Sequence, residues 1–138
     1  MSGQQALVAV VDDDGSVRQS TCRLIRSFGY RAEGFAGGDE FLAFLSSPRA
    51  AEAACLILDV RMPGIGGLEV QRRLVERAAR IPIVFLTALA SDDEERRARN
   101  AGAIEVLRKP VEKETLLRVL ESALRASRGL GGVGHDDD

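Results

Sequence analysis

Short apolar stretches recur along the chain at intervals that suit strands alternating with helices. A continuous apolar run of strand length predicts a strand buried on both faces, as in the interior of a parallel sheet. A stretch of alternating apolar and polar residues predicts a strand with one exposed face. The strands predicted in this way cover residues 6–11, 30–35, 55–58, 81–87 and 104–107.

Between these strands, apolar side chains return at the three- and four-residue spacing of amphipathic helices. Capping residues mark several predicted starts: Ser16 with Gln19, Asp39 alone, and Ser91 with Glu94. The predicted helices cover about residues 16–28, 39–45, 68–75, 92–100 and 112–126. Strands and helices in alternation predict right-handed βα units around a parallel sheet, which is an α/β fold.

The composition supports one globular domain. A chain of 138 residues with 45% apolar and 29% charged residues is long enough to bury a real core. We expect the domain to span residues 1–127 and to be followed by a glycine-rich, flexible tail over 128–138. Cys22 and Cys55 lie in apolar segments without metal-ligand spacing, so we expect two reduced core thiols.

Charge and hydropathy limit the kinds of partner and the cell compartment that the sequence predicts. A net charge of −2 and an aromatic content of 4% give no case for direct nucleic-acid contact. No apolar run approaches the roughly 18 residues of a membrane span, and the first residues do not resemble a signal peptide. The sequence therefore predicts a cytoplasmic protein without a membrane partner.

Polar residues stand where the predicted strands end. Asp12 and Asp13 follow the first strand, Asp59 the third, Thr87 ends the fourth and Lys109 follows the fifth. Because parallel strands end at one edge of the sheet, these side chains should converge there.

Clustered carboxylates repel one another, and a hard divalent cation with oxygen ligands would keep them ionised. We therefore predict a Mg²⁺ site made of Asp12, Asp13, Asp59 and the backbone carbonyl of Arg61.

These groups suit phosphoryl transfer, which needs a nucleophile, a metal and fixed donors. Asp59 could attack phosphorus and form an acyl phosphate, with Lys109 and Thr87 contacting the phosphoryl oxygens. The only histidine, His135, lies in the predicted tail, so no histidine base is expected.

Two other readings stay open. A Mg²⁺-dependent phosphatase of the haloacid-dehalogenase type would need an aspartate where this chain has Arg61, which cannot act as a general acid. The second reading is a flavodoxin-like interaction module, or a domain with the same cluster that is never phosphorylated. In both cases the acidic edge is merely solvated. Asp14 on its own reads as a helix cap or a solvated group in either case.

Four segments together resemble the receiver domain of two-component response regulators, over about residues 6–127. They are VVDDD at 10–14, LDVRMPG at 58–64, LTA at 86–88 and RKP at 108–110. The resemblance implies a flavodoxin-like (βα)5 three-layer sandwich with strand order 2-1-3-4-5 and a cis Lys109–Pro110 bond. It implies that Asp59 is the phosphoacceptor, that a sensor histidine kinase is the donor, and that the protein acts only on itself.

Among receivers, the chain looks most like the nitrogen-fixation regulator subgroup. The family resemblance implies a possible homodimer through helix 4, strand 5 and helix 5, while the charged residues within 92–99 suit a solvated face equally well. The output is either this domain alone or a DNA-binding domain beyond it. The sequence departs from receivers at Val106, where an aromatic switch residue is usual, and at Val111. We expect phosphorylation to pull Thr87 and residues 88–91 inward and to be transmitted by a shift of helix 4 and strand 5.

Overall fold

The computed structural model describes residues 6–136, with side chains described as far as Ser127. Five parallel strands form one sheet in the order β2-β1-β3-β4-β5, as predicted. The strands are β1 (Leu7–Val11), β2 (Arg31–Phe35), β3 (Ala53–Leu58), β4 (Ile83–Thr87) and β5 (Glu105–Arg108). The three interior strands are the most apolar, because their side chains are covered on both faces of the sheet.

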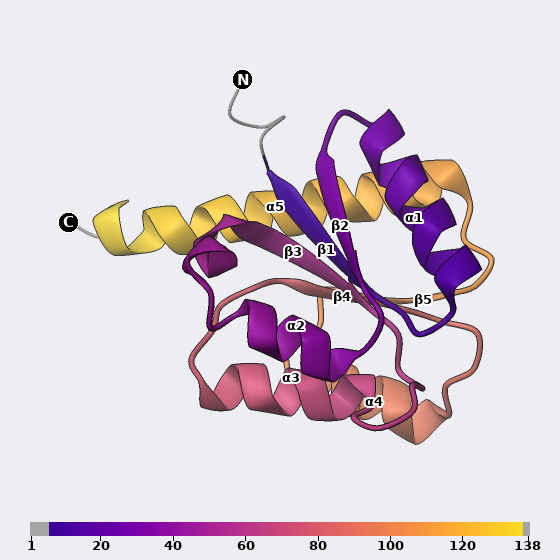
Figure 1. Cartoon of the computed structure of the whole chain (residues 1–138). Coiled ribbons are helices and arrows are strands. Elements are labelled where there is room, and N and C mark those ends of the chain that lie inside the picture. The colour runs from indigo at the N-terminus through magenta and orange to yellow at the C-terminus, as the bar shows by residue number, and fades with distance from the viewer. Residues whose placement is uncertain (1–5, 137–138) are drawn as a thin grey trace.

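Within residues 6–136, five α-helices cover the sheet. They form two outer layers, one on each face (Figure 1). They are α1 (Gly15–Ser27), α2 (Gly38–Phe44), α3 (Gly67–Glu76), α4 (Asp92–Asn100) and α5 (Lys113–Asp136), with a 3-10 helix η2 (Pro48–Glu52) before β3. Helices α1 and α5 pack on one face of the sheet around Ile25 and Leu120. Helices α2, α3 and α4 pack on the other around Phe41 and Val70. This is the predicted flavodoxin-like three-layer sandwich.

Two of the three predicted caps are wrong. Asp14, not Ser16, caps α1: its carboxylate accepts hydrogen bonds from the backbone N–H groups of Ser16 and Val17. Gly37, not Asp39, precedes α2 and makes no side-chain cap. The third prediction, the capping box at the start of α4, is confirmed.

The last helix runs past its predicted end at Ala126 and continues to Asp136. Extending an existing helix needs no new nucleus, which offsets part of the cost of its glycines. The division of the chain at residue 127 into a domain and a flexible tail stays a prediction, and residues 137–138 lie outside the described residues. Within residues 6–136, none of the helices combines the length and the apolar character that crossing a bilayer demands.

The strand register places the functional edge. Val11 lies opposite Leu58 in the β1–β3 pairing, so Asp12 and Asp59, one residue further along, are level with each other. Thr87 lies opposite Arg108 in the β4–β5 pairing, which brings Lys109 just beyond the end of β4. The sheet alone therefore aligns side chains that are up to 97 positions apart in the sequence.

Candidate functional site

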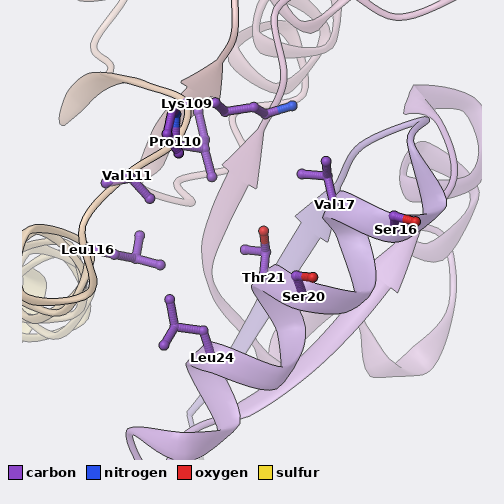
Figure 2. A pocket seen from close by; sticks show the side chains of 10 residues that line it. Ser16, Val17, Ser20, Thr21, Leu24, Lys109, Pro110, Val111 and Leu116 are labelled. Carbon is purple, nitrogen blue, oxygen red and sulfur yellow. The ribbon is translucent and has the colours of Figure 1, made fainter.

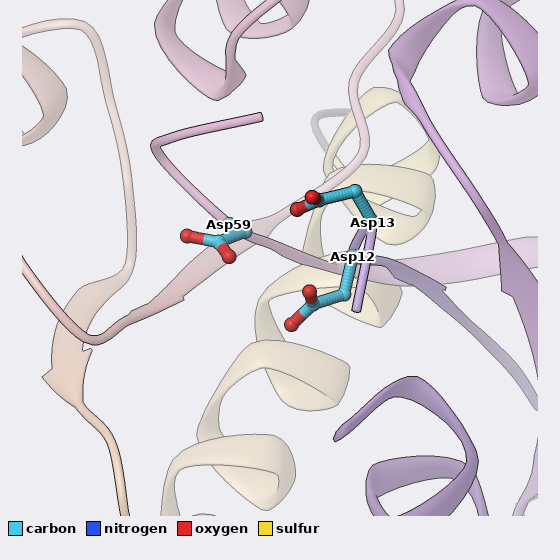
Figure 3. Close-up of side chains that lie close together, drawn as sticks. All are labelled: Asp12, Asp13 and Asp59. Atoms are coloured by element: carbon cyan, nitrogen blue, oxygen red, sulfur yellow. The ribbon is translucent and has the colours of Figure 1, made fainter. Parts of the chain in front are cut away.

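Three carboxylates gather at the carboxyl edge of the sheet, where the sequence predicts them (Figure 3). One oxygen each of Asp12, Asp13 and Asp59 can be chosen so that all three lie within 4.8 Å of one another. Asp12 and Asp59 are 4% and 8% exposed, whereas Asp13 is exposed to solvent. The cluster thus has a buried floor and one open side.

Lys109 bridges the two buried carboxylates. Its Nζ lies 2.7 Å from Oδ2 of Asp12 and 3.0 Å from Oδ2 of Asp59. Burial of the ammonium lowers its pKa, but the hydrogen bonds and negative charges of the two aspartates outweigh that effect, so the pKa of Lys109 is raised. The Lys109–Pro110 peptide bond is cis, as the resemblance implied.

Backbone N–H groups orient the carboxylates of Asp12 and Asp59. The N–H of Asp14 donates to Oδ1 of Asp12 at 2.9 Å, and the N–H of Arg61 donates to Oδ1 of Asp59 at 3.3 Å. Each carboxylate therefore has one oxygen fixed by the main chain and one bound to Lys109. The carboxylate of Asp14 caps α1, which confirms the prediction that Asp14 is a helix cap.

Thr87 is buried at the end of β4, with 1% of its surface exposed. Its hydroxyl donates to the carbonyl of Leu89 at 3.1 Å and accepts from the N–H of Leu89 at 3.3 Å. Its backbone carbonyl accepts from the N–H of Lys109 at 2.9 Å. The threonine is thus tied to the lysine by the main chain and to its own loop by its side chain.

Arg18 supports the site, and the sequence did not reveal it. Its Nη1 donates to the backbone carbonyl of Asp12 at 2.7 Å. The stem of Arg18 crosses β2 at Gly34, where an added Cβ would lie 2.9 Å from Cγ and 3.0 Å from Cδ of the arginine. A glycine inside a strand was the available signal, because it often marks the close approach of another group.

Gly67, the first residue of α3, is a second residue that supports the site and that the sequence did not reveal. A Cβ at this position would overlap the carbonyl oxygen of Asp59 and lie 3.0 Å from a ring carbon of Phe85. The helix can therefore start directly behind the acidic cluster only because this residue has no side chain.

A groove of about 490 Å³ lies beside the cluster, between α1 and the segment that joins β5 to α5 (Figure 2). Its walls are mostly apolar, and hydroxyl groups of α1 lie along one side. Lys109, which bridges the two aspartates, also lines this groove. The groove and the acidic cluster are therefore adjoining parts of one surface.

The donor set fits a hard divalent cation. Three carboxylates with oxygens this close can bind a metal, and oxygen ligands with one open side suit Mg²⁺, which keeps several of its waters. A metal that used the Oδ2 atoms of Asp12 and Asp59 would compete with Lys109, because these atoms now accept hydrogen bonds from the ammonium.

Comparison with known proteins identifies the kind of domain that carries such a cluster. Residues 8–121 match the family model described as "Response regulator receiver domain". The response regulator protein TmoT of Ectopseudomonas mendocina is 38% identical over 125 residues, which cover 91% of this chain and 56% of TmoT. The transcriptional regulatory protein FixJ of Bradyrhizobium diazoefficiens is 33% identical over 118 residues, covering 86% of this chain and 56% of FixJ. This chain thus spans about half the length of these relatives.

Solved structures agree with the sequence relatives. The response regulator StyR superposes with a TM-score of 0.84 at 40% identity, over 96% of this chain and 65% of that one. The structure titled FixJ-N superposes with a TM-score of 0.77 at 28% identity, over 88% of this chain and 94% of that one. The match to FixJ bears out the likeness to the nitrogen-fixation regulator subgroup that the sequence indicated.

Proposed function

Because this chain belongs to the family of response regulator receiver domains, we propose that Asp59 accepts a phosphoryl group from a sensor histidine kinase in a Mg²⁺-dependent reaction. One observation carries the proposal: Lys109 bridges Asp12 and Asp59 at the edge of a cluster that can bind a metal. A buried nucleophile, its metal ligands and a fixed cation are the parts that phosphoryl transfer requires.

In the proposed transfer, a carboxylate oxygen of Asp59 forms a bond to phosphorus while the P–N bond of the donor phosphohistidine breaks. The electron pair of that bond returns to the imidazole nitrogen, and the product on Asp59 is a mixed carboxylic–phosphoric anhydride. The N–H of Arg61 fixes one carboxylate oxygen, which lowers the freedom of the nucleophile before attack.

We propose that Mg²⁺ is held by Asp12, Asp13, Asp59 and the backbone carbonyl of Arg61. When bound, it neutralises phosphoryl oxygens and aligns them with the nucleophile. The chain's own contribution is the fixed orientation of these ligands, since the N–H of Asp14 and the guanidinium of Arg18 both hold the residue Asp12 in place.

Lys109 and Thr87 supply the remaining contacts in this proposal. The ammonium of Lys109 passes from Oδ2 of Asp59 to a phosphoryl oxygen, so its charge stays paired throughout. The hydroxyl of Thr87 turns from Leu89 to a second phosphoryl oxygen. These moves need no proton transfer.

The competing readings fit the geometry less well. The Arg61 guanidinium, bound to the carbonyl of Leu89 and to Glu94, cannot release a proton to a leaving group as the phosphatase would require. A merely solvated edge does not account for two carboxylates that are more than nine-tenths buried against one lysine. The protein is better described as a phosphoacceptor that acts on itself than as an enzyme with external substrates.

The groove between α1 and the β5–α5 segment is where we place the approaching kinase. It adjoins Lys109, so a protein surface that brings phosphohistidine to Asp59 would cover it. Half-buried apolar side chains of the walls, such as Val17, Leu24 and Val111, would be removed from water on docking, which favours association.

We also propose a homodimer through α4, β5 and α5. Charged side chains on this face already pair within the chain: Arg96 with Asp93, Arg108 with Glu95, and Arg99 with Glu105. The relative FixJ carries the words "transcriptional regulatory protein" in its name, so we propose that the domain controls a DNA-binding segment of a longer cytoplasmic protein.

The experiment that tests the phosphoacceptor is incubation with acetyl phosphate and Mg²⁺, followed by mass spectrometry. We expect a gain of one phosphoryl group in the native chain and none in Asp59→Asn. Asp14→Asn is the matched control, because asparagine also caps helices and the Asp14 side chain is bonded to the first turn of α1 rather than placed in the cluster. An unmodified native chain, or a modified Asp59→Asn variant, contradicts the proposal.

A further inference from the structure

The side chain of Arg61 ties the segment after the acidic cluster to the loop between β4 and α4, residues 88–91. Its Nε donates to the carbonyl of Leu89 at 3.2 Å, and its Nη2 lies 2.7 Å from Oε1 of Glu94. The same Glu94 oxygen accepts from the N–H of Ser91 at 2.9 Å and closes the capping box of α4. One guanidinium therefore holds both the loop and the first turn of α4.

The two contacts of Arg61 constrain each other. A guanidinium is planar and rigid, so its Nε and Nη2 donors keep a fixed separation and direction. Leu89 and Glu94 can both be bound only while the loop and the start of α4 keep their present relation. A movement of the loop relative to α4 must break at least one of the two.

Thr87 shares an acceptor with Arg61. The Leu89 carbonyl accepts one hydrogen bond from the hydroxyl of Thr87 and another from the Nε–H of Arg61. A hydroxyl has one proton to donate, so Thr87 must give up Leu89 before it can donate to a phosphoryl group. The position of the Leu89 carbonyl thus decides how readily Thr87 is released.

We propose that Arg61 is a positioning residue for Thr87, and that its guanidinium clamps the β4–α4 loop in the unphosphorylated conformation. This inference rests on the proposed phosphorylation of Asp59 and adds the group that opposes the switch. When Thr87 moves to the phosphoryl group, the Leu89 carbonyl moves with the loop and at least one hydrogen bond of Arg61, to Leu89 or to Glu94, breaks. The first turn of α4 is then no longer held to the loop by Arg61. The route needs no aromatic ring at the buried residue Val106.

The expected effect is small and measurable. The Arg61 side chain is 53% exposed, and an exposed ion pair changes an equilibrium constant by up to about fivefold. Removing a contact that exists only in the unphosphorylated conformation raises affinity for a phosphoryl mimic by the same factor, because the two equilibria are linked.

The test measures beryllium fluoride binding in the presence of Mg²⁺, together with backbone amide shifts, in Arg61→Met and Glu94→Gln. Methionine keeps the length of the arginine stem and the backbone carbonyl. Glutamine at position 94 retains the capping box but removes the charge. Arg72→Met is the matched control, because Arg72 is 57% exposed and is paired with Glu69 and Glu76 of its own helix.

We expect Arg61→Met to bind beryllium fluoride about two- to fivefold more tightly than the native chain, Glu94→Gln to show a smaller gain, and the double variant to match Arg61→Met. Without the mimic, the amides of residues 88–91 in Arg61→Met should shift toward their mimic-bound positions, whereas Arg72→Met should change neither quantity.

Unchanged or weaker binding by Arg61→Met, or loop amides that stay in place, overturns the clamp while leaving the phosphoacceptor intact. A native chain that fails to bind the mimic at all overturns the proposed function instead, and the clamp falls with it. The two failures are therefore distinguishable.

Discussion

Replacing Lys109 with methionine removes the cation that bridges Asp12 and Asp59. Two hydrogen bonds are lost, of 2.7 and 3.0 Å, and two largely buried carboxylates are left facing each other. Methionine keeps most of the side-chain volume, so the change is chiefly one of charge. Lys113, the chain's other lysine, is exposed, and Lys113→Met is the matched control.

The magnitude follows from the geometry. A hydrogen bond to a charged group contributes about 1.5–3 kcal/mol, and the open side of the cluster lets water solvate part of what is lost. We therefore expect Lys109→Met to lower the free energy of unfolding by ~2–4 kcal/mol in the absence of divalent metal. With a typical urea m-value, the midpoint of unfolding falls by about 1–2 M.

Mg²⁺ should reverse much of this loss. A ligand at a hundred times its dissociation constant stabilises the native state by about 2.7 kcal/mol. The variant should bind the metal more tightly than the native chain, because the ammonium no longer competes for the Oδ2 atoms of Asp12 and Asp59. The assay is urea unfolding followed by far-ultraviolet circular dichroism, with EDTA and then with millimolar Mg²⁺.

Two results would refute this reasoning. Equal midpoints for the native chain and Lys109→Met in EDTA would show that the bridge contributes nothing to stability. A Mg²⁺ increment no larger in the variant than in the native chain would show that metal and lysine do not compete for these oxygens.

Four further outcomes are expected. Gly67→Ala should lower stability by ~1–3 kcal/mol through its overlap with the strand behind it, whereas Gly37→Ala, with open space around its Cβ, should cost less; urea midpoints compare them. Asp14→Ala should cost ~1 kcal/mol in the same assay and still gain a phosphoryl group from acetyl phosphate. The pKa of Lys109 is raised above its ordinary 10.5 in the folded state, so its contribution to stability should be complete below about pH 10. This contribution should disappear as the pH rises through the folded pKa. The difference in unfolding free energy between the native chain and Lys109→Met should therefore shrink at high pH. Burial raises the pKa of Cys55 to about 12, so iodoacetamide at pH 8 should label this thiol only after unfolding, and labelling of the folded chain would contradict the burial.

The fold was predictable because the signals that set it are local. Continuous apolar runs identify the interior strands, and parallel strands have to end at one edge. The convergence of Asp12, Asp59 and Lys109 follows from those two facts alone. The cis bond before Pro110 and the subgroup required the family resemblance in addition.

The features that the sequence could not predict depend on distances between separate helices, strands and loops. Choosing Asp14 over Ser16 as the cap of α1 turns on where the chain leaves β1, which no pattern encodes. The bond from Arg18 to the carbonyl of Asp12 and the reach of Arg61 to Leu89 require the packed sheet and loops. The end of α5 was predicted too early because the glycines after Ala126 indicate a low helix propensity. The composition does not show that a helix already formed can be extended without a new nucleus.

The ion pairs on α4 and β5 have a consequence for assembly. Arg108 with Glu95, and Arg99 with Glu105, already satisfy one another within a single chain. In the proposed homodimer, a bond made across the interface would replace one broken inside each subunit, so the exchange is close to neutral in free energy. These ion pairs would then add little to the affinity of the dimer, so the other contacts of α4, β5 and α5 would decide whether two chains associate.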